Sequence, residues 1–375
     1  MLYQNQMTKK SYLLLILSFF SINVLHSQIY INPGVDTTDS NIKAAIKFYS
    51  NYIGEFKGRK LPDFRKYWSA EDCKKYTVPD PSVYGIGGDY PTYSMTTTKT
   101  IHYVKPLKNG MINLKMMGGW VDSLKNFEAM YITNHYLEKK ADGNLMLIQP
   151  IQFFKNNWQT KQVESITYYY PKYHSFNKKK ANNLIRQIRE LQQQWDLSPI
   201  AIEYFFADTY DEIQLIRGFD FTMGIGNVDK PMGISNQKDH TVFCAGNGED
   251  YFHEVVHIYL NPQHPKSPLN EGLAVYYGGS MGNSIDWHVA RLKTYLNQHQ
   301  EIDLNKLEDF YYLDNYTNPN SAIQGLLCKL AYQKDGIRGL KRIMSYTSMN
   351  EVFEKEFKLN VNQLNTELRA LINRQ

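Results

Sequence analysis

Residues 251–260, YFHEVVHIYL, place two histidines and a glutamate inside an otherwise apolar segment. His253 and His257 are four positions apart, so on a helix both imidazoles lie on one face. The neighbouring apolar residues, which predict that this helix is buried, are Val255, Val256, Ile258 and Leu260. Buried polar side chains need partners. A metal ion held between the two imidazoles would supply one, and this requirement constrains how the rest of the chain can fold.

The H-E-x-x-H spacing favours zinc chemistry. Neutral imidazole is a good zinc ligand, and Glu254 lies beside the two histidines, where it can take a proton from a bound water. A catalytic zinc site holds three protein ligands and one open position. The stretch SPLNEGLAVYY (267–277) offers Glu271 as the third ligand. The sequence therefore predicts about one zinc ion per chain.

The alternative third ligand is His264. It follows His257 by seven positions, whereas metzincins use a glycine turn and a six-residue spacing that this chain lacks. Thirteen residues (258–270) separate His257 from Glu271, enough for a second helix to return antiparallel to the first. We therefore favour Glu271.

The ends of these two helices also have sequence signals. Glu249 or Asp250 is expected at the N-terminus of the first helix, and Pro262 just beyond its end. The second helix is expected to have Ser267 as its cap and Pro268 at its first position, and to end at Gly278-Gly279.

HEVVH followed by LNEGLAVYY resembles the gluzincins, and the nearest match is the peptidase MA-like family, over residues 164–375. The resemblance implies that His253, His257 and Glu271 bind zinc and that Glu254 is the general base. It also implies a tyrosine that stabilises the oxyanion. NYTNPNSAIQGLL (315–327) offers Tyr316, and the other candidates are Tyr312, Tyr276 and Tyr277.

Two departures from the family pattern matter. MGISNQ (232–237) lacks the glutamate with which aminopeptidases hold a free amino terminus, so the resemblance favours an endopeptidase acting on peptides or proteins. Val275 stands where thermolysin has the acid that supports a ligand histidine, and the sequence names no replacement.

Two other functions are compatible with parts of the sequence. Residues 278–282 satisfy G-x-S-x-G, which would make Ser280 the nucleophile of a serine hydrolase, but that turn needs a preceding strand. Here a helix is expected before it, and neither His288 nor His299 has a clear acid in the required order. A secreted binding protein with the metallopeptidase fold but no catalysis is the other alternative.

The N-terminus predicts export. Lys9 and Lys10 precede an apolar run from Tyr12 to Leu25, and Ser27 suits cleavage, which makes residues 1–27 a signal peptide. The run is shorter than the roughly 20 residues that span a bilayer, so no stable membrane insertion is expected after cleavage. The protein is expected to be secreted, or to lie in the periplasm or cell envelope. A net charge of +5 does not favour nucleic acid as a partner.

The expected fold class is α+β. Residues 28–163 form an N-terminal domain in which a helix with apolar positions from Ile42 to Ile53 covers an antiparallel sheet, loosely resembling the cone of the nuclear transport factor two superfamily. Its expected strands are Thr96–Val104, Met111–Met117, Met130–Leu137 and Leu145–Phe154. Residues 164–375 form a mostly helical domain with a small mixed sheet, whose expected strands are Ser165–Tyr170, Ile200–Phe206 and Thr241–Ala245.

Overall fold

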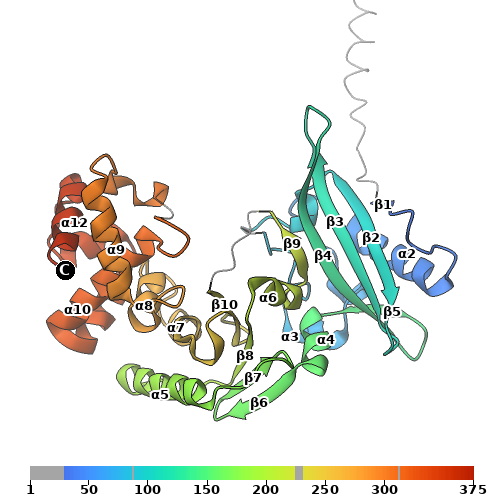
Figure 1. Ribbon diagram of the computed structural model, residues 1–375, viewed down its shortest axis with the longest axis horizontal. Coiled ribbons are helices and arrows are strands. Elements are labelled where there is room, and N and C mark those ends of the chain that lie inside the picture. Colours follow the sequence, from blue (N-terminus) through green and yellow to red (C-terminus); the bar gives the residue numbers. More distant parts are fainter. Residues whose placement is uncertain (1–28, 87, 224–230, 311–312) are drawn as a thin grey trace, which may run out of the picture.

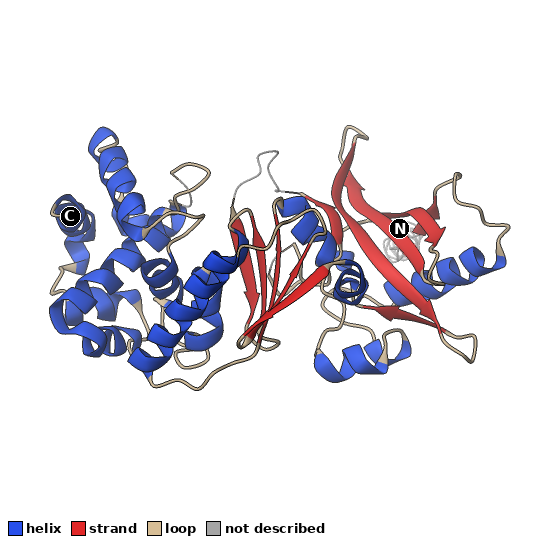
Figure 2. Cartoon of the chain, turned by 60° about the horizontal axis from the view of Figure 1, so that its bottom comes forward, coloured by secondary structure: helices blue, strands red, loops and turns tan. Residues whose placement is uncertain are grey.

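The computed structural model describes residues 29–86, 88–223, 231–310 and 313–375. Residues 1–27, predicted as the signal peptide, lie outside these ranges. The fold is α+β, as expected. A mixed sheet with helices lies at one end, a second mixed sheet lies in the middle, and a helical region lies at the other end (Figures 1 and 2).

The first sheet has the order β1-β2-β3-β4-β5, with β9 also pairing with β4. Its strands are β1 (Ile29–Ile31), β2 (Thr98–Pro106), β3 (Ile112–Val121), β4 (Phe127–Lys139), β5 (Leu145–Ile148) and β9 (Phe219–Thr222). β1 runs parallel to β2, so the expectation of a purely antiparallel sheet was wrong. The long segment between these strands contains two helices, which is enough chain to bring β2 back in the same direction as β1.

The helices of the first region are α2 (Ser40–Gly54) and α3 (Ala70–Lys75). α2 begins as expected, because the Asp39 carboxylate accepts the amides of Asn41 and Ile42. Its apolar face is buried against the sheet, and α2 and the sheet share one hydrophobic core.

The expected strand Leu145–Phe154 was wrong in its second half. β5 ends at Ile148, and α4 runs over Pro150–Asn157. Proline has no amide hydrogen for a strand ladder, but it suits the first turn of a helix. Pro150 occupies that position in α4.

The second sheet has the order β10-β11-β8-β7-β6. Its strands are β6 (Gln159–Val163), β7 (Ile166–Tyr170), β8 (Ile202–Ala207), β10 (Met232–Asn236) and β11 (Thr241–Ala245). The three central strands are parallel, and both edge strands are antiparallel to their neighbours. α5 (Lys178–Trp195) covers one face with its apolar stripe, whereas α4 and α6 (Tyr210–Ile216) cover the other.

Strand pairing crosses the domain boundary predicted at residue 163 in both directions. β6 precedes that boundary but belongs to the second sheet. β9 follows it but pairs with β4 of the first sheet. Each side of residue 163 thus contributes one strand to the sheet of the other side. The division into domains 28–163 and 164–375 stays a prediction.

The C-terminal region is helical, as expected. Its helices are α7 (Phe252–Leu260), α8 (Asn270–Gly278), α9 (Ile285–Gln298), α10 (Pro319–Met344), α11 (Met349–Glu351) and α12 (Leu364–Asn373). α8 starts later than predicted, because Ser267 accepts the amide of Leu269 and leaves Pro268 outside the helix. Among the described residues, no helix is both long and apolar enough to cross a membrane.

α8 is packed tightly against α10. A Cβ atom on Gly272 would lie 2.4 Å from Cβ of Gln324 and 2.6 Å from that residue's backbone carbon. The Gly272 amide also donates to Oε1 of Gln324 at 3.2 Å. The glycine that follows Glu271 is therefore needed for the approach of the two helices.

We predict that Gly272→Ala costs about 1–3 kcal/mol of stability, because the added methyl group overlaps backbone that cannot move aside. Gly54→Ala is the matched control: it too adds a methyl group to a helical glycine, but nothing lies within 4 Å of the new atom. Thermal unfolding followed by circular dichroism should show a lower melting temperature only for Gly272→Ala. Equal melting temperatures would contradict the packing argument.

Candidate metal centre

α7 lies at the carboxyl end of β11, after a turn in which Gly246 and Gly248 both have a φ of +73°. Every residue of the helix is buried, including His253, Glu254 and His257. The apolar run around the motif therefore places all three polar side chains in the interior, as predicted.

Neither acidic residue before α7 caps it, contrary to expectation. The helix begins after Tyr251, without a side-chain cap. The Glu249 carboxylate instead accepts the Asn177 amide at 2.6 Å and contacts Nε2 of His174 at 3.0 Å. Asp250 accepts the side-chain amide of Asn183. Both acids lie on a single 3-10 turn that faces the start of α5, so they bind groups there.

Three predicted ligand atoms converge in one place. Nε2 of His253 and Nε2 of His257 are 3.1 Å apart. The two carboxylate oxygens of Glu271, from α8, lie 3.5 Å from His253 Nε2 and 3.3 Å from His257 Nε2. Ligands at 2.0–2.1 Å around a tetrahedral zinc ion are separated by about 3.3 Å. The three side chains therefore fit the coordination of zinc.

The outer nitrogen of each imidazole contacts an acceptor. Nδ1 of His253 lies 2.6 Å from the carbonyl oxygen of Gly279, and Nδ1 of His257 lies 3.2 Å from Oδ1 of Asn261. Both oxygens accept hydrogen bonds, so each Nδ1 donates and each Nε2 keeps its lone pair for a metal. These are the supporting contacts for which the sequence analysis named no residue.

Two consecutive glycines bring the Gly279 carbonyl to His253. A Cβ on Gly278 would lie 2.3 Å from the His253 amide nitrogen, so α8 touches the start of α7. Gly279 has a φ of +70°, in the region that favours glycine, and ends the helix as predicted. The pair thus ends α8 and also orients a ligand histidine.

The charges of the site favour a cation. Burial alone lowers the pKa of His257, but the hydrogen bond to Glu271 and the charges of Glu254 and Glu271 outweigh it and raise that pKa. Burial alone raises the pKa of Glu271, but the two histidines outweigh it and lower that pKa. Two carboxylates thus face two imidazoles, and positive charge among them is stabilised.

Glu254 differs from the three ligand residues in having no hydrogen-bond partner among the described residues. It is 6% exposed. It lies against β10, where a Cβ on Gly233 would be 2.6 Å from its Cγ and 2.8 Å from its Oε1. Tyr251 completes the wall, with its ring stacked 5.6 Å from the His253 ring. The sequence did not point to Gly233 or Tyr251, since both matter only through their position in space.

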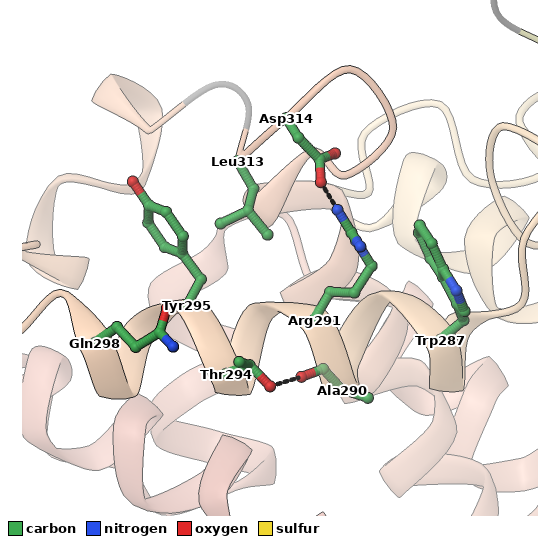
Figure 3. A pocket seen from close by; sticks show the side chains of 8 residues that line it. All are labelled: Trp287, Ala290, Arg291, Thr294, Tyr295, Gln298, Leu313 and Asp314. Atoms are coloured by element: carbon green, nitrogen blue, oxygen red, sulfur yellow. Dashed lines mark hydrogen bonds and ion pairs between the residues drawn. The ribbon is translucent and has the colours of Figure 1, made fainter.

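Tyr316 lies in the loop before α10 and is 36% exposed. Asp314 holds this loop to α9: one carboxylate oxygen accepts the amides of Tyr316 and Thr317, and the other pairs with Arg291 (Figure 3). The Tyr316 ring lies 6.4 Å from Trp287, which lines a cavity of about 510 Å³ along α9. Within the described ranges, the structure brings Tyr316 into no contact with the three ligand residues.

The other candidate tyrosines lie elsewhere. Tyr277 accepts the indole N–H of Trp195 and donates to Gln194, so its hydroxyl is used in packing against α5. The Tyr276 ring packs against Tyr332. Tyr312 is outside the described residues.

His264 and Ser280 are not brought into comparable sites. The His264 ring packs against Trp195 at 5.4 Å, and among the described residues the group that could hold a metal ion contains Glu271 rather than His264. Ser280 follows helix α8, not a strand, and His288 contacts its backbone carbonyl at 2.9 Å rather than its hydroxyl. The context that a serine nucleophile requires is therefore missing.

Comparison with known proteins adds no family assignment. No protein-family model matches the sequence, and searches of curated proteins and of solved structures find no significant match. The functional argument therefore depends on the geometry of the site.

We predict that the mature protein binds about one zinc ion per chain. Glu271→Gln should weaken zinc affinity by at least about tenfold, since loss of an outer partner alone costs 10–100-fold. The matched control is His264→Gln, which should leave zinc affinity unchanged. Metal analysis after dialysis and competition with a chelator measure both. Zinc-free wild-type protein, or an effect of His264→Gln alone, would contradict the assignment.

Proposed function

We propose that this protein is a zinc-dependent peptidase of the gluzincin type. The observation that carries the proposal is the convergence of ligand atoms of His253, His257 and Glu271 within 4.8 Å of one another. Beside them lies Glu254, which is buried and has no hydrogen-bond partner among the described residues. Hydrolysis by a metal-activated water requires three metal ligands, acceptors that orient the ligand histidines, and a carboxylate beside the metal that can take a proton. The two histidines with Glu271, the acceptors at each Nδ1, and Glu254 meet these requirements.

Glu254 acts as the general base in this proposal. His253, His257 and Glu271 would hold a zinc ion, which would supply Lewis-acid polarisation of a water molecule and of a substrate carbonyl. Glu254 takes a proton from the attacking water and then delivers it to the amine that leaves. Its burial suits both steps, because no hydrogen bond from the described part of the chain competes for the carboxylate and little bulk water reaches it.

Strand β10 supports a peptide as the substrate. In the described part of the chain its only partner is β11, so its other edge is open. Gly233 of this strand lies directly against Glu254. An extended peptide that pairs with an open strand edge is held by main-chain hydrogen bonds. Such a peptide would pass beside the general base, which favours an endopeptidase.

The remaining family inferences belong to the same proposal. Residues 164–375 are the peptidase MA-like domain, and residues 28–163 are a cone-shaped domain like those of the nuclear transport factor two superfamily. Residues 1–27 direct export, so the enzyme acts outside the cell, in the periplasm or in the cell envelope. A secreted binding protein with the same fold is the alternative, and it differs by binding zinc without cleaving peptides.

We predict that Glu254→Gln keeps zinc but lowers peptide hydrolysis by about 10²–10⁴-fold, because glutamine keeps the size of the side chain and cannot take a proton. Glu354→Gln, on an exposed position of the helical region, is the control and should keep full activity. Hydrolysis of a peptide library with blocked termini measures the effect. Full activity of Glu254→Gln would remove the mechanism, and cleavage of free amino termini only would replace the endopeptidase assignment.

We also predict that Tyr316→Phe lowers kcat more than it changes KM, as expected for a hydroxyl that stabilises charge only in the transition state. Tyr346→Phe removes a hydroxyl from the same helical region and should change neither constant. Steady-state kinetics on one cleaved peptide separates the two effects. An unchanged kcat for Tyr316→Phe would assign the oxyanion contact to another group.

A further inference from the structure

A second cavity, of about 430 Å³, lies beside strand β10 but away from the metal centre. It is formed between the first region and the second sheet, and its walls include Ile151, Arg217, Ile234, Asn236 and Phe243. Phe243 and Ile151 belong to the core on the α4 and α6 side of the sheet. The metal centre lies on the opposite side, with α5 and α7.

Arg217 gives this cavity a positive charge. It follows α6, and its Nη1 donates to Oε1 of Gln214 at 2.7 Å. Within the described residues it forms no ion pair with a carboxylate. Burial lowers the pKa of its guanidinium, and Tyr210 only partly offsets that effect. Tyr210 also hydrogen-bonds to this guanidinium. A guanidinium has five N–H donors, so donors beyond those that contact Gln214 and Tyr210 are left for a ligand.

The other charged groups of the cavity nearly cancel. Lys238 and Asp239 both line it, and Asp239 accepts the side-chain amide of Asn236. Arg217 therefore remains as the uncompensated charge. A partly buried charge without a counter-ion is unfavourable. A planar carboxylate can accept two parallel hydrogen bonds from a guanidinium, and it is the anionic group of an unmodified acidic side chain.

Strand β10 links this cavity to the metal centre. Gly233 pairs with Cys244 and faces Glu254, whereas Ile234 pairs with Phe243 and Asn236 with Thr241 on the cavity side. Successive side chains of an extended strand point to opposite faces. A peptide paired with the open edge of β10 would likewise direct alternate side chains toward the two faces.

We propose that Arg217 binds the carboxylate of an acidic side chain in the substrate peptide, in this cavity. The inference rests on the proposed peptidase function and adds a substrate class to it. Antiparallel pairing, the commoner kind, would run the peptide from Asn236 toward Gly233. These positions are about 10 Å apart along the strand, so the acidic residue lies roughly two to four residues before the cleaved bond.

The experiment compares peptides with blocked termini that carry Glu or Gln at each of these positions. The wild-type enzyme should cleave the best Glu peptide with a kcat/KM about 10–100 times that of its Gln counterpart, the range of a charge-assisted hydrogen bond. In Arg217→Gln this ratio should fall toward one, whereas Arg217→Lys should keep part of it. Arg338→Gln, an exposed arginine of α10, should keep the whole ratio.

Binding to the zinc-loaded Glu254→Gln protein, measured by fluorescence anisotropy, separates this inference from the proposed function. If Glu peptides bind more tightly through Arg217 but wild type cleaves nothing, the function fails and the inference stands. If wild type cleaves Glu and Gln peptides equally, the inference is overturned while the function stands. A preserved ratio in folded Arg217→Gln also overturns it. Should both Arg217 variants fail to fold, the wild-type ratio alone decides.

Discussion

The hydrogen bond between Nδ1 of His253 and the carbonyl oxygen of Gly279 joins the two helices that carry the candidate metal ligands. It requires α8 to touch the start of α7, which Gly278 permits by having no side chain. Gly272 allows the same closeness between α8 and α10. These contacts determine the position of Glu271 opposite the two histidines. Because α8 is packed against both α7 and α10, it cannot rotate about its axis, and its first turn, which contains Glu271, stays directed toward the histidines.

Hydrogen-bond partners distinguish structural from functional charges in this chain. Asp80, 2% exposed in the first region, accepts hydrogen bonds from Tyr52 and Tyr93 at 2.8 Å and from Ser82 at 2.5 Å, and it lies 3.2 Å from His135 Nε2. Its carboxylate is fully satisfied and strengthens the core. Glu254 is similarly buried but has no such partner among the described residues. A folded protein keeps a buried carboxylate without partners only at a cost in stability, which is typical of a group that acts on a ligand.

Sequence periodicity was sufficient where each element carries its own signal. The apolar face of α2 and strand β11 were predicted from residues that are close in the chain. The parallel pairing of β1 with β2 and the pairing of β9 with β4 of the first sheet were not predicted. The sheet to which a short strand belongs depends on segments that are distant in the sequence. In the site, the histidine and glutamate positions were readable from spacing. The contact of the Gly279 carbonyl with His253 was not, since any residue has a backbone carbonyl and none marks this one as an acceptor. Asn261 could have been found from the sequence, because residues four apart on a helix are neighbours and Asn261 follows His257 by four.

Strand β10 connects the two charged sites, and its open edge needs a physical reason. An unpaired strand edge invites pairing with other chains, so proteins usually cover or block it. β10 is five residues long and begins after Pro231, which limits that hazard. Gly233 removes the side chain that would separate the strand from Glu254, and the next residue, Ile234, faces the cavity that contains Arg217. One short strand therefore offers main-chain hydrogen bonds, a route past the proposed general base and access to a positive cavity. These are the features that an extended peptide with an acidic side chain would use together.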